Sequence, residues 1–396
     1  MNKLPPTMEN DIKFLRIQNF KSIKDVTLLP RRVNLIIGEP NVGKSNLLEA
    51  MTLLGGITYE QTEKFMGSFI RYEEPRQLFY DNLVGNTIKV ETDKDVAVLL
   101  FEKKSKKFEY LLCNKELYSE LLTGFPPTTS NRTTLAGHAT VLPKIPLEQI
   151  KAEMHDGFSV STLAHTSFGD AANSKAELYD FGYDLPVAVP PKSYGFHKNA
   201  PISQDSGHHS LTPPNGSNLL EIIQTHPRLR QEIAQMFERY GQKLQLRMDE
   251  RRIEIVKDQD GVIYSYPYSS VADTLQRIIF YLAAIESNDD AVLLFEEPEA
   301  HSFPVYVSKL GRRIVESRNN QFFIDTHSPY LVTEILETML TDDAQAGELA
   351  MFAAYYEDHQ TKVHQLSDEE IRSIRNDSID VFYNMKRFTT GAAHNA

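Results

Sequence analysis

Eight consecutive residues, Gly38-Glu39-Pro40-Asn41-Val42-Gly43-Lys44-Ser45, have the types and spacing needed to hold a phosphate group. They fit the pattern G-x-x-x-x-G-K-[ST], in which glycines let the backbone turn so that several N–H groups point at one anion. A lysine at the position of Lys44 reaches the terminal phosphates, and a hydroxyl at the position of Ser45 binds Mg²⁺. An ordinary glycine turn is the alternative explanation, and the flanking residues decide between the two.

The segments on either side of this loop are the elements that such a site requires. Residues 32–37 predict a buried strand before the loop, and residues 45–51 predict a helix after it. A strand that turns through glycines into the first turn of a helix aims free backbone N–H groups at a bound phosphate. The predicted nucleotide-binding residues of the loop are Gly38, Asn41, Gly43, Lys44, Ser45 and Asn46.

A second segment ends a predicted strand in two carboxylates. Residues 291–295 are apolar throughout, which is typical of a strand buried on both faces, and Glu296 and Glu297 follow directly. Beside a phosphate loop, Glu296 would hold Mg²⁺ directly or through water, and Glu297 would orient or deprotonate the attacking water. Taken alone, the same pattern also fits a strand that ends in a solvated acidic turn.

A third segment places a histidine at the end of another apolar strand. Residues 321–324 lead into Asp325, Thr326 and His327. An imidazole at such a position can donate a hydrogen bond to the γ-phosphate and so sense its presence. The sequence therefore predicts a functional role for His327, although a lone histidine is more often a packing or surface residue.

A fourth segment contains two serines just before an apolar helix. Ser269 and Ser270 are favourable N-cap residues, and a capped helix N-terminus binds phosphate through its free N–H groups. A plain helix cap explains this segment equally well.

Composition and charge indicate a globular chain without disulfides. Of the 396 residues, 41% are hydrophobic and 24% charged, and Cys113 is the single cysteine. One cysteine permits no internal disulfide, and no apolar run reaches membrane-spanning length, so we expect a cytoplasmic protein without a membrane partner. The net charge of −12 disfavours a broad nucleic-acid surface. Two local basic patches, at 103–107 and around Arg247, Arg251 and Arg252, leave nucleic-acid contact open, and they also fit a solvated turn and a strand edge.

The chain divides into three predicted regions. Residues 1–112 form the first half of the domain that carries the phosphate loop, residues 113–215 an insertion, and residues 216–396 the second half. The insertion lacks regular periodicity and is rich in turn residues, and a loop-rich segment of this length is usually functional or disordered. We expect a lid or a partner-contact region there, with a short helix near 147–154.

The two outer regions carry the regular structure. Alternating residues predict a strand-rich first region, and the second contains an amphipathic segment at 218–240 that Pro227 must break. From Ser269 onward helices and strands alternate, which is typical of a sheet with helices on its faces. Further strands are predicted at 12–17, 25–28, 87–90, 96–101, 108–112, 244–247, 252–256, 349–356 and 362–366, with a helical tail after them.

Together these segments resemble the ABC-type ATPase heads of SMC and RecF proteins and of the OLD-like AAA ATPases of bacteria. Residues 18–23 are similar to the opening motif of these heads, residues 296–301 to the acidic motif and D-loop of the OLD-like branch, and residues 326–329 to its switch-histidine motif. The resemblance covers about 12–110 and 215–365. It implies an α/β P-loop NTPase of the ABC-ATPase type: a mixed sheet flanked by helices, with an N-terminal antiparallel β subdomain and an irregular insertion.

The resemblance also implies an activity and partners. It implies that ATP and Mg²⁺ bind, that Glu297 and His327 act in hydrolysis, and that two heads pair. Each phosphate loop would then face the signature residues of the other subunit, here Ser269 and Ser270. The chain is similar to stand-alone ATPases of two-component antiviral systems such as PARIS. That similarity implies a homo-oligomer of head-to-head dimers that controls a separate nuclease-like effector in bacterial antiviral defence.

The chain departs from the family pattern at three places. Val271 stands where a signature glycine is expected, Glu296 replaces the aspartate of the wider family, and Gln77 is the one candidate for the glutamine that contacts Mg²⁺. The heptad run of an SMC coiled coil is missing, and the residues after His327 contain no acidic cluster suited to a two-metal nuclease.

Two other functions stay open from the sequence. The imperfect signature fits a scaffold that uses ATP to assemble but turns over little, whereas the intact Glu297 favours hydrolysis. A RecF-like DNA-repair ATPase is the other alternative, and the acidic charge balance disfavours it.

Overall fold

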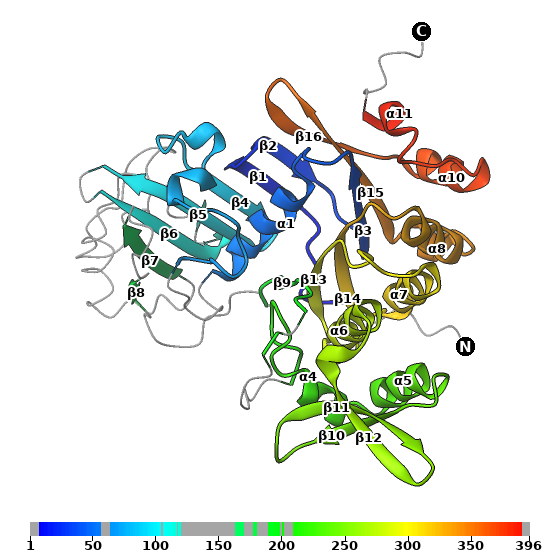
Figure 1. Cartoon of the computed structure of the whole chain (residues 1–396). Coiled ribbons are helices and arrows are strands. Elements are labelled where there is room, and N and C mark those ends of the chain that lie inside the picture. Colours follow the sequence, from blue (N-terminus) through cyan, green and yellow to red (C-terminus); the bar gives the residue numbers. More distant parts are fainter. Residues whose placement is uncertain are drawn as a thin grey trace.

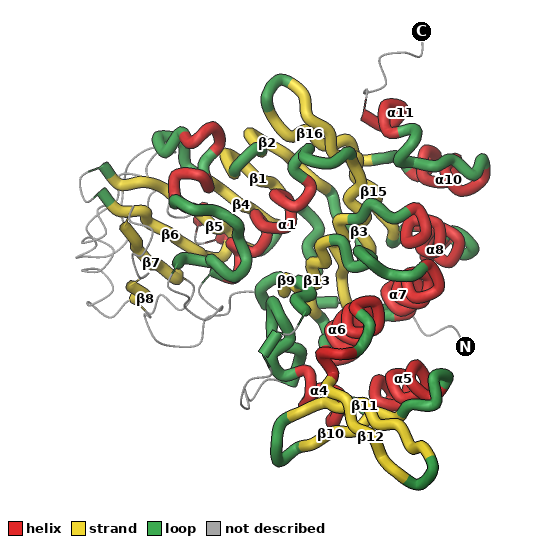
Figure 2. Tube along the Cα trace, in the orientation of Figure 1, coloured by secondary structure: helices red, strands yellow, loops and turns green. Residues whose placement is uncertain are grey.

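The computed structural model describes residues 8–56, 64–103, 106–116, 118–119, 163–169, 177–179, 189–198, 200–201 and 209–389. Within these residues the strands form three sheets (Figure 1). Figure 2 shows a row of helices on one side of the central strands and the largest sheet on the other side. The predicted architecture, a mixed sheet flanked by helices and joined to an antiparallel β subdomain, is confirmed.

The N-terminal sheet is antiparallel throughout its described strands, in the order β2-β1-β4-β5-β6-β7-β8. The predicted hairpin is present, with Ile17 paired to Val26 across β1 and β2. The other strands predicted before the insertion are also observed. The bounds are β1 (Leu15–Phe20), β2 (Ile23–Leu28), β4 (Ile88–Thr92), β5 (Asp95–Glu102), β6 (Lys107–Asn114), β7 (Leu163–Gly169) and β8 (Glu177–Tyr179).

The central sheet has the order β16-β15-β3-β14-β13-β9 in the described part of the chain. All neighbours run parallel except β16, which is the antiparallel edge partner of β15. The edge strand β9 was not predicted, because a strand of this length shows no periodicity in the sequence. The bounds are β3 (Val33–Gly38), β9 (Lys192–Tyr194), β13 (Ala291–Glu296), β14 (Asn320–Asp325), β15 (Leu349–Glu357) and β16 (Gln360–Gln365).

The central strands are apolar without interruption because both faces of the sheet are covered. In β13, Leu293 and Phe295 belong to the core under the helices, whereas Val292 and Leu294 belong to the core shared with the antiparallel sheet. Successive side chains of a strand point to opposite faces, so a doubly covered strand requires apolar residues at every position. Helix α1 (Lys44–Thr52) covers the second face, and α6 (Asp273–Ser287), α7 (Pro304–Glu316) and α8 (Pro329–Met339) cover the first.

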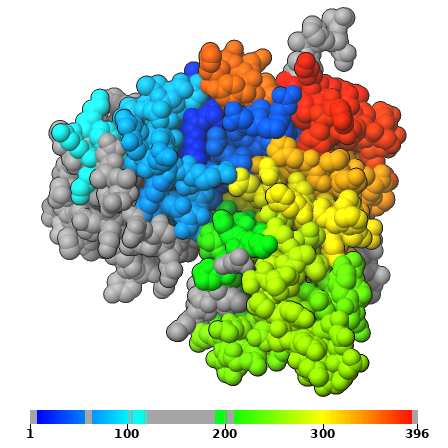
Figure 3. Space-filling view, viewed as in Figure 1, coloured from blue at the N-terminus to red at the C-terminus, as the bar shows by residue number. Residues whose placement is uncertain are grey.

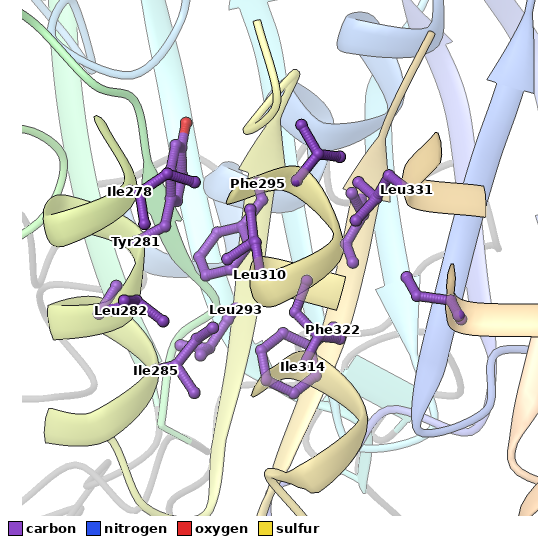
Figure 4. Close-up of a cluster of buried hydrophobic side chains, with 14 of the residues drawn as sticks. Ile278, Tyr281, Leu282, Ile285, Leu293, Phe295, Leu310, Ile314, Phe322 and Leu331 are labelled. Carbon is purple, nitrogen blue, oxygen red and sulfur yellow. The ribbon is translucent and has the colours of Figure 1, made fainter. Parts of the chain in front are cut away.

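Figure 4 shows how these helices contact the first face of the sheet. Leu310 and Ile314 lie one helical turn apart on α7 and point toward Phe295 and Phe322 of the strands. All four side chains are fully buried. Residues spaced four apart share one face of a helix, so the apolar stripe of α7 seats the helix on the sheet.

Residues 219–267 form a smaller lobe. The predicted break at Pro227 is confirmed, because this residue begins a second helix. The three-stranded antiparallel sheet beside these helices protrudes from the rest of the molecule (Figures 1 and 3). The bounds are α4 (Leu219–Thr225), α5 (Pro227–Glu238), β10 (Lys243–Arg247), β11 (Arg252–Gln259) and β12 (Val262–Pro267).

Short elements complete the described chain. The predicted helical tail is observed after β16, and Ser367 caps its first helix through a hydrogen bond from the backbone N–H of Glu370. The short α-helices are α9 (Asp343–Ala346), α10 (Asp368–Asn376) and α11 (Met385–Thr389). The 3₁₀ helices are η1 (Leu53–Gly55), η2 (Pro75–Leu78), η3 (Tyr80–Asn82) and η5 (Tyr268–Ser270).

The prediction that Ser269 and Ser270 cap α6 is wrong. Both serines lie in η5, and the N-cap of α6 is Ala272. Val271 is extended, with φ −66° and ψ 147°, and separates the serines from the helix. The Ser270 hydroxyl donates to the carbonyl of Pro267 at 2.7 Å. A serine side chain can bond to nearby backbone outside a helix, and that local bond replaces the expected cap.

The region predicted as an insertion contributes strands to both large sheets. β7 and β8 extend the antiparallel sheet beyond β6, and β9 joins the edge of the central sheet. The helix predicted near 147–154 lies outside the described residues. The functional division at 113 and 215 stays a prediction. No helix in the described ranges combines the length and the apolarity needed to cross a membrane.

The packing of α7 makes a testable prediction about stability. Leu310 is fully buried, whereas Val305 on the same helix is 56% exposed. We expect Leu310→Ala to lower the free energy of unfolding by about 2–5 kcal/mol, because it leaves a cavity against the sheet. Val305→Ala is the matched control, with an expected change below about 0.5 kcal/mol. Urea unfolding measures both variants, and equal losses would contradict the assigned packing of α7.

Candidate functional site

The phosphate-loop pattern connects β3 to α1 as predicted. Gly38 ends the strand and Lys44 begins the helix. A Cβ on Gly38 would lie 2.5 Å from the carbonyl oxygen of Ala354 in β15, so only glycine fits there. Asn41 and Gly43 have positive φ values of 63° and 92°. Such angles turn the chain sharply into the helix.

A network of hydroxyls holds the loop from behind. Asn46 Nδ2 donates to Ser22 Oγ at 2.7 Å, and Ser22 Oγ lies 2.6 Å from Thr361 Oγ1. Thr361 Oγ1 donates to the carbonyl of Val42 at 2.8 Å. A Cβ on Gly43 would overlap both hydroxyls. The β1–β2 turn and the β15–β16 hairpin therefore fix the loop conformation together.

This network gives one predicted nucleotide-binding residue a different contact, and it adds two residues to the site that were not predicted. Asn46 was predicted to bind nucleotide, but its amide contacts Ser22. Ser22 lies in the opening motif at 18–23, which was the available signal for it. No pattern in the sequence marks Thr361 as part of the site. Its hairpin, β15–β16, reaches the loop only because β15 pairs with β3.

Lys44 is the buried cation of the site, with 4% of its surface exposed. Its Nζ donates to the carbonyl of Glu39 at 3.1 Å and lies 3.9 Å from Asp325 Oδ1. Burial lowers the pKa of Lys44, and the carboxylate of Asp325 acts in the opposite direction. A phosphate beside Lys44 would give its buried ammonium a second anion besides Asp325.

Asp325 meets Ser45 at the centre of the site. Ser45 Oγ donates to Asp325 Oδ2 at 3.1 Å, while Oδ1 of this buried carboxylate has no hydrogen-bond partner. Burial raises the pKa of Asp325 to about 7, although Lys44 and Ser45 lower it. In the sequence, Asp325 is recognisable only as a polar residue at the end of a strand. The missing information was that β14 is the neighbour of β3.

The two consecutive glutamates at the end of β13 point in different directions. Glu296 Oε1 accepts a hydrogen bond from Arg71 Nη2 at 2.7 Å. Glu297 has a φ of 41°, and its backbone N–H donates to the carbonyl of Asp325 at 2.9 Å. Its Oε1 lies 3.4 Å from His327 Nε2. Left-handed backbone in a non-glycine residue is strained and is common at functional sites.

His327 is held in place by a buried glutamate. Glu299 Oε1 accepts from the backbone N–H of His327 at 2.9 Å and from Thr326 Oγ1 at 2.6 Å. Burial lowers the pKa of His327, Lys44 lowers it further, and Glu297 raises it. Burial also raises the pKa of Glu299. Glu299 was not predicted to have a role. Its place in the acidic motif at 296–301 was the sequence feature that could have indicated one.

The structure thus brings the predicted loop residues, the acidic pair and the histidine to one edge of the central sheet. It does not bring Ser269 and Ser270 there, because both lie exposed in η5, which contacts β11 of the small sheet. Gln77 uses its side-chain oxygen to accept from the backbone N–H groups of Glu73, at 2.7 Å, and Glu74, at 3.3 Å.

The oxygen donors at the loop suit a hard cation. Ser45 supplies a hydroxyl, Asp325 a carboxylate oxygen without a partner, and Glu296 a half-exposed carboxylate. In the described residues no group of three or more His, Cys, Asp and Glu side chains could hold a metal by itself. Mg²⁺ commonly binds to one or two protein oxygens and takes further ligands from substrate phosphates and water. The residues present therefore fit a magnesium ion that arrives with a nucleotide.

The phosphate loop, the acidic pair and the histidine lie at the carboxyl ends of neighbouring parallel strands, which is the arrangement of a P-loop nucleotide-binding domain of the AAA type. A family model described as "AAA domain, putative AbiEii toxin, Type IV TA system" matches residues 33–333, from β3 into α8. The chain belongs to this family.

Solved structures of SMC head domains are similar to the chain at low sequence identity. A SMC head bound to the C-winged helix domain of ScpA shares 13% identity, with a TM-score of 0.44 over 92% of this chain and 99% of that chain. The SMC head of Thermotoga maritima shares 13%, with a TM-score of 0.37 over 90% and 99%. A Smc head with an extended coiled coil, bound to the C-terminal domain of ScpA derived from Pyrococcus furiosus, shares 14%, with a TM-score of 0.44 over 93% and 99%. A comparison with curated protein sequences gives no match.

The buried carboxyl of Asp325 predicts how stability depends on pH. Its pKa of about 7 in the folded chain lies above its ordinary value of 3.8, so folding favours the protonated form. The resulting stabilisation is complete below pH 4 and is lost as pH rises through 7. Asp325→Asn removes this titration, so the variant should gain about 2–4 kcal/mol relative to the natural chain between pH 4 and pH 8.

Urea unfolding in EDTA at a series of pH values measures this gain. Asp343→Asn is the control, because the side chain of Asp343 is 92% exposed. Identical pH profiles for the natural chain and Asp325→Asn would contradict a buried, titrating Asp325.

Proposed function

We propose that this protein binds ATP with Mg²⁺, hydrolyses it, and pairs with a second copy through the bound nucleotide. The observation that carries the proposal is a convergence of distant segments at the carboxyl ends of β3, β14 and β13. Ser45 Oγ lies 3.1 Å from Asp325 Oδ2, and Glu297 Oε1 lies 3.4 Å from His327 Nε2. These are the groups that phosphoryl transfer to water needs: an anion cradle, metal ligands and a base.

Phosphate binding would fall to the loop and to Lys44. The free N–H groups at the start of α1 would donate hydrogen bonds to the phosphate oxygens, and the buried ammonium of Lys44 would compensate their charge. Ser45, with Glu296 and Asp325 beside it, would hold Mg²⁺. When bound, the ion would neutralise charge on the phosphate oxygens.

Hydrolysis would use the pair formed by Glu297 and His327. A carboxylate that is half exposed at the site can accept a proton from the attacking water. The lowered pKa of His327 keeps the imidazole neutral near pH 7, so it can donate one hydrogen bond to a γ-phosphate without adding a charge. Glu299 would keep that imidazole in reach through its bonds to Thr326 and His327.

Pairing with a second copy is supported by the position of the signature residues. Ser269 and Ser270 are exposed on η5, so they are accessible to another subunit. We propose that they contact the nucleotide held by the partner copy, which completes the site only in a dimer. The altered signature, with Val271 in place of glycine, would make this contact through the serine hydroxyls and η5 backbone.

The biological role is proposed from the resemblance to antiviral ATPases and from the family description, which names a toxin and a type IV toxin–antitoxin system. We propose that the protein works in the bacterial cytoplasm and controls a separate nuclease-like effector. Residues 113–215 are the proposed contact region. A nuclease gene beside the gene for this chain would support the defence role.

Removal of Lys44 tests nucleotide binding. Lys44→Ala should weaken ATP binding at least about tenfold, because a charge-assisted phosphate contact is lost. Lys309→Ala is the control. Lys309 lies on α7 and forms an ion pair with Glu232 of α5 at 3.0 Å. Calorimetry with ATP and Mg²⁺ measures both variants. Absence of binding by the natural chain would contradict the proposed function.

Replacement of Glu297 tests hydrolysis. Glu297→Gln keeps the size of the side chain but removes the proton acceptor, so phosphate release should fall by about 10²–10⁴-fold while ATP binding persists. The trapped ATP state should then appear as a dimer in light scattering. Equal phosphate release by the variant and the natural chain would favour the alternative of an ATP-assembled scaffold.

The RecF-like alternative is less well supported by the structure. Arg247 lies in ion pairs with Glu250 and Glu254, and Arg252 lies 3.7 Å from Glu250. These carboxylates pair with two of the three arginines of the basic patch predicted in the sequence. Duplex binding that falls steeply with salt would support a DNA-repair role, and no binding at low salt would exclude it.

A further inference from the structure

Four alternating charges connect the β1–β2 turn to the end of β13. Lys21 Nζ pairs with Glu49, and Glu49 Oε1 accepts from Arg71 Nε at 2.7 Å. Arg71 Nη2 then donates to Glu296 Oε1 at 2.7 Å. Only Glu296, the last member, has a role in the proposed function. Lys21 lies in the opening motif at 18–23, whereas Glu49 and Arg71 are not part of any motif found in the sequence.

Arg71 is fixed at one end and exposed at the other. Glu49 is 5% exposed and lies on α1, the helix that begins with Lys44. Lys21 Nζ also donates to the backbone carbonyl of Arg71 at 2.8 Å, so the arginine is held through backbone and side chain. By contrast, the Glu296 side chain is 39% exposed and has water as an alternative partner.

The charges at the sheet edge explain why a cation is needed there. Glu296, Glu297 and Asp325 all carry carboxyl groups at the ends of β13 and β14. Lys44 is directed at Asp325, and His327 faces Glu297. Glu296 has Arg71 as its cation. Like charges this close repel unless each is compensated.

We propose that Arg71 is a positioning residue that holds Glu296 until Mg²⁺ arrives with the nucleotide. This inference rests on the proposed function. The guanidinium and the metal are both cations drawn to the single carboxylate of Glu296, and their mutual repulsion weakens the Arg71–Glu296 contact when the metal binds. Arg71 keeps its Nε bond to Glu49 during the exchange, which returns the guanidinium to Glu296 when the metal leaves. Arg71 thereby sets how much Mg²⁺ strengthens nucleotide binding.

Arg71→Gln separates this role from a structural one. Lys21 still compensates the buried Glu49 in the variant, so the fold should be retained. Arg76→Gln is the matched control, because Arg76 is an exposed arginine a few residues further on that pairs with Glu74 instead. Circular dichroism and urea unfolding check that both variants are folded.

The measurement is the dissociation constant of the non-hydrolysable analogue AMP-PNP, by calorimetry, in EDTA and in saturating Mg²⁺. The ratio of the constant in EDTA to the constant in Mg²⁺ is the factor by which the metal strengthens nucleotide binding. Arg71→Gln should raise this ratio about three- to fivefold, the effect of one exposed ion pair, and leave the constant in EDTA unchanged. Arg76→Gln should leave both unchanged. In a Glu296→Gln background the effect of Arg71→Gln should disappear.

Each other result overturns the inference in a distinct way. An unchanged ratio shows that Arg71 does not compete with the metal. Weaker binding in EDTA shows that Arg71 contacts the nucleotide itself. If the natural chain does not bind AMP-PNP at all, the proposed function has failed and this inference fails with it. Retained binding with an unchanged ratio contradicts the inference alone.

Discussion

The parallel register of β3, β14 and β13 is the constraint on which the site depends. Ile36 pairs with Asp325, and Asp325 pairs with Glu296, so the residues that follow the three strands emerge at one edge of the sheet. Apolar side chains on both faces hold this register, because a slip by one residue would exchange the two cores. The phosphate loop, the acidic pair and the histidine are therefore placed by burial far from the chemistry itself.

The same edge concentrates charge, and compensation of that charge shapes the site. Each carboxylate has a cation or a donor directed at it: Lys44 at Asp325, Arg71 at Glu296, and His327 at Glu297. The compensation at Asp325 is incomplete, since burial still raises the pKa of this group to about 7. A site with an incompletely compensated carboxyl group beside a buried lysine is suited to a ligand that brings both phosphate and a divalent cation.

The loop itself is held by elements from both large sheets. Ser22 comes from the β1–β2 turn and Thr361 from β16, and their hydroxyls meet behind Gly43. Arg71 adds a third connection, from Glu49 on α1 to Glu296 on β13. The antiparallel sheet is thus part of the site, because without it the loop and Glu296 would lose their supporting contacts. The exposed serines of η5 lie apart from this assembly and are left for a second copy in the proposed mechanism.

The sequence by itself determined the local chemistry: the phosphate loop, the acidic pair, the histidine, most of the strands and the break at Pro227 follow from residue types and spacing within short windows. The strands β7, β8, β9 and β12 were not predicted. Tertiary structure alone decided the partners. Asp325 beside Ser45, Arg71 beside Glu296 and Thr361 behind the loop arise from pairings between strands or loops far apart in the chain. The expected cap by Ser269 and Ser270 was wrong because a local hydrogen bond to Pro267 competes with capping. Periodicity and motifs report what each segment can do, whereas the order of strands in a sheet depends on the burial of the whole core.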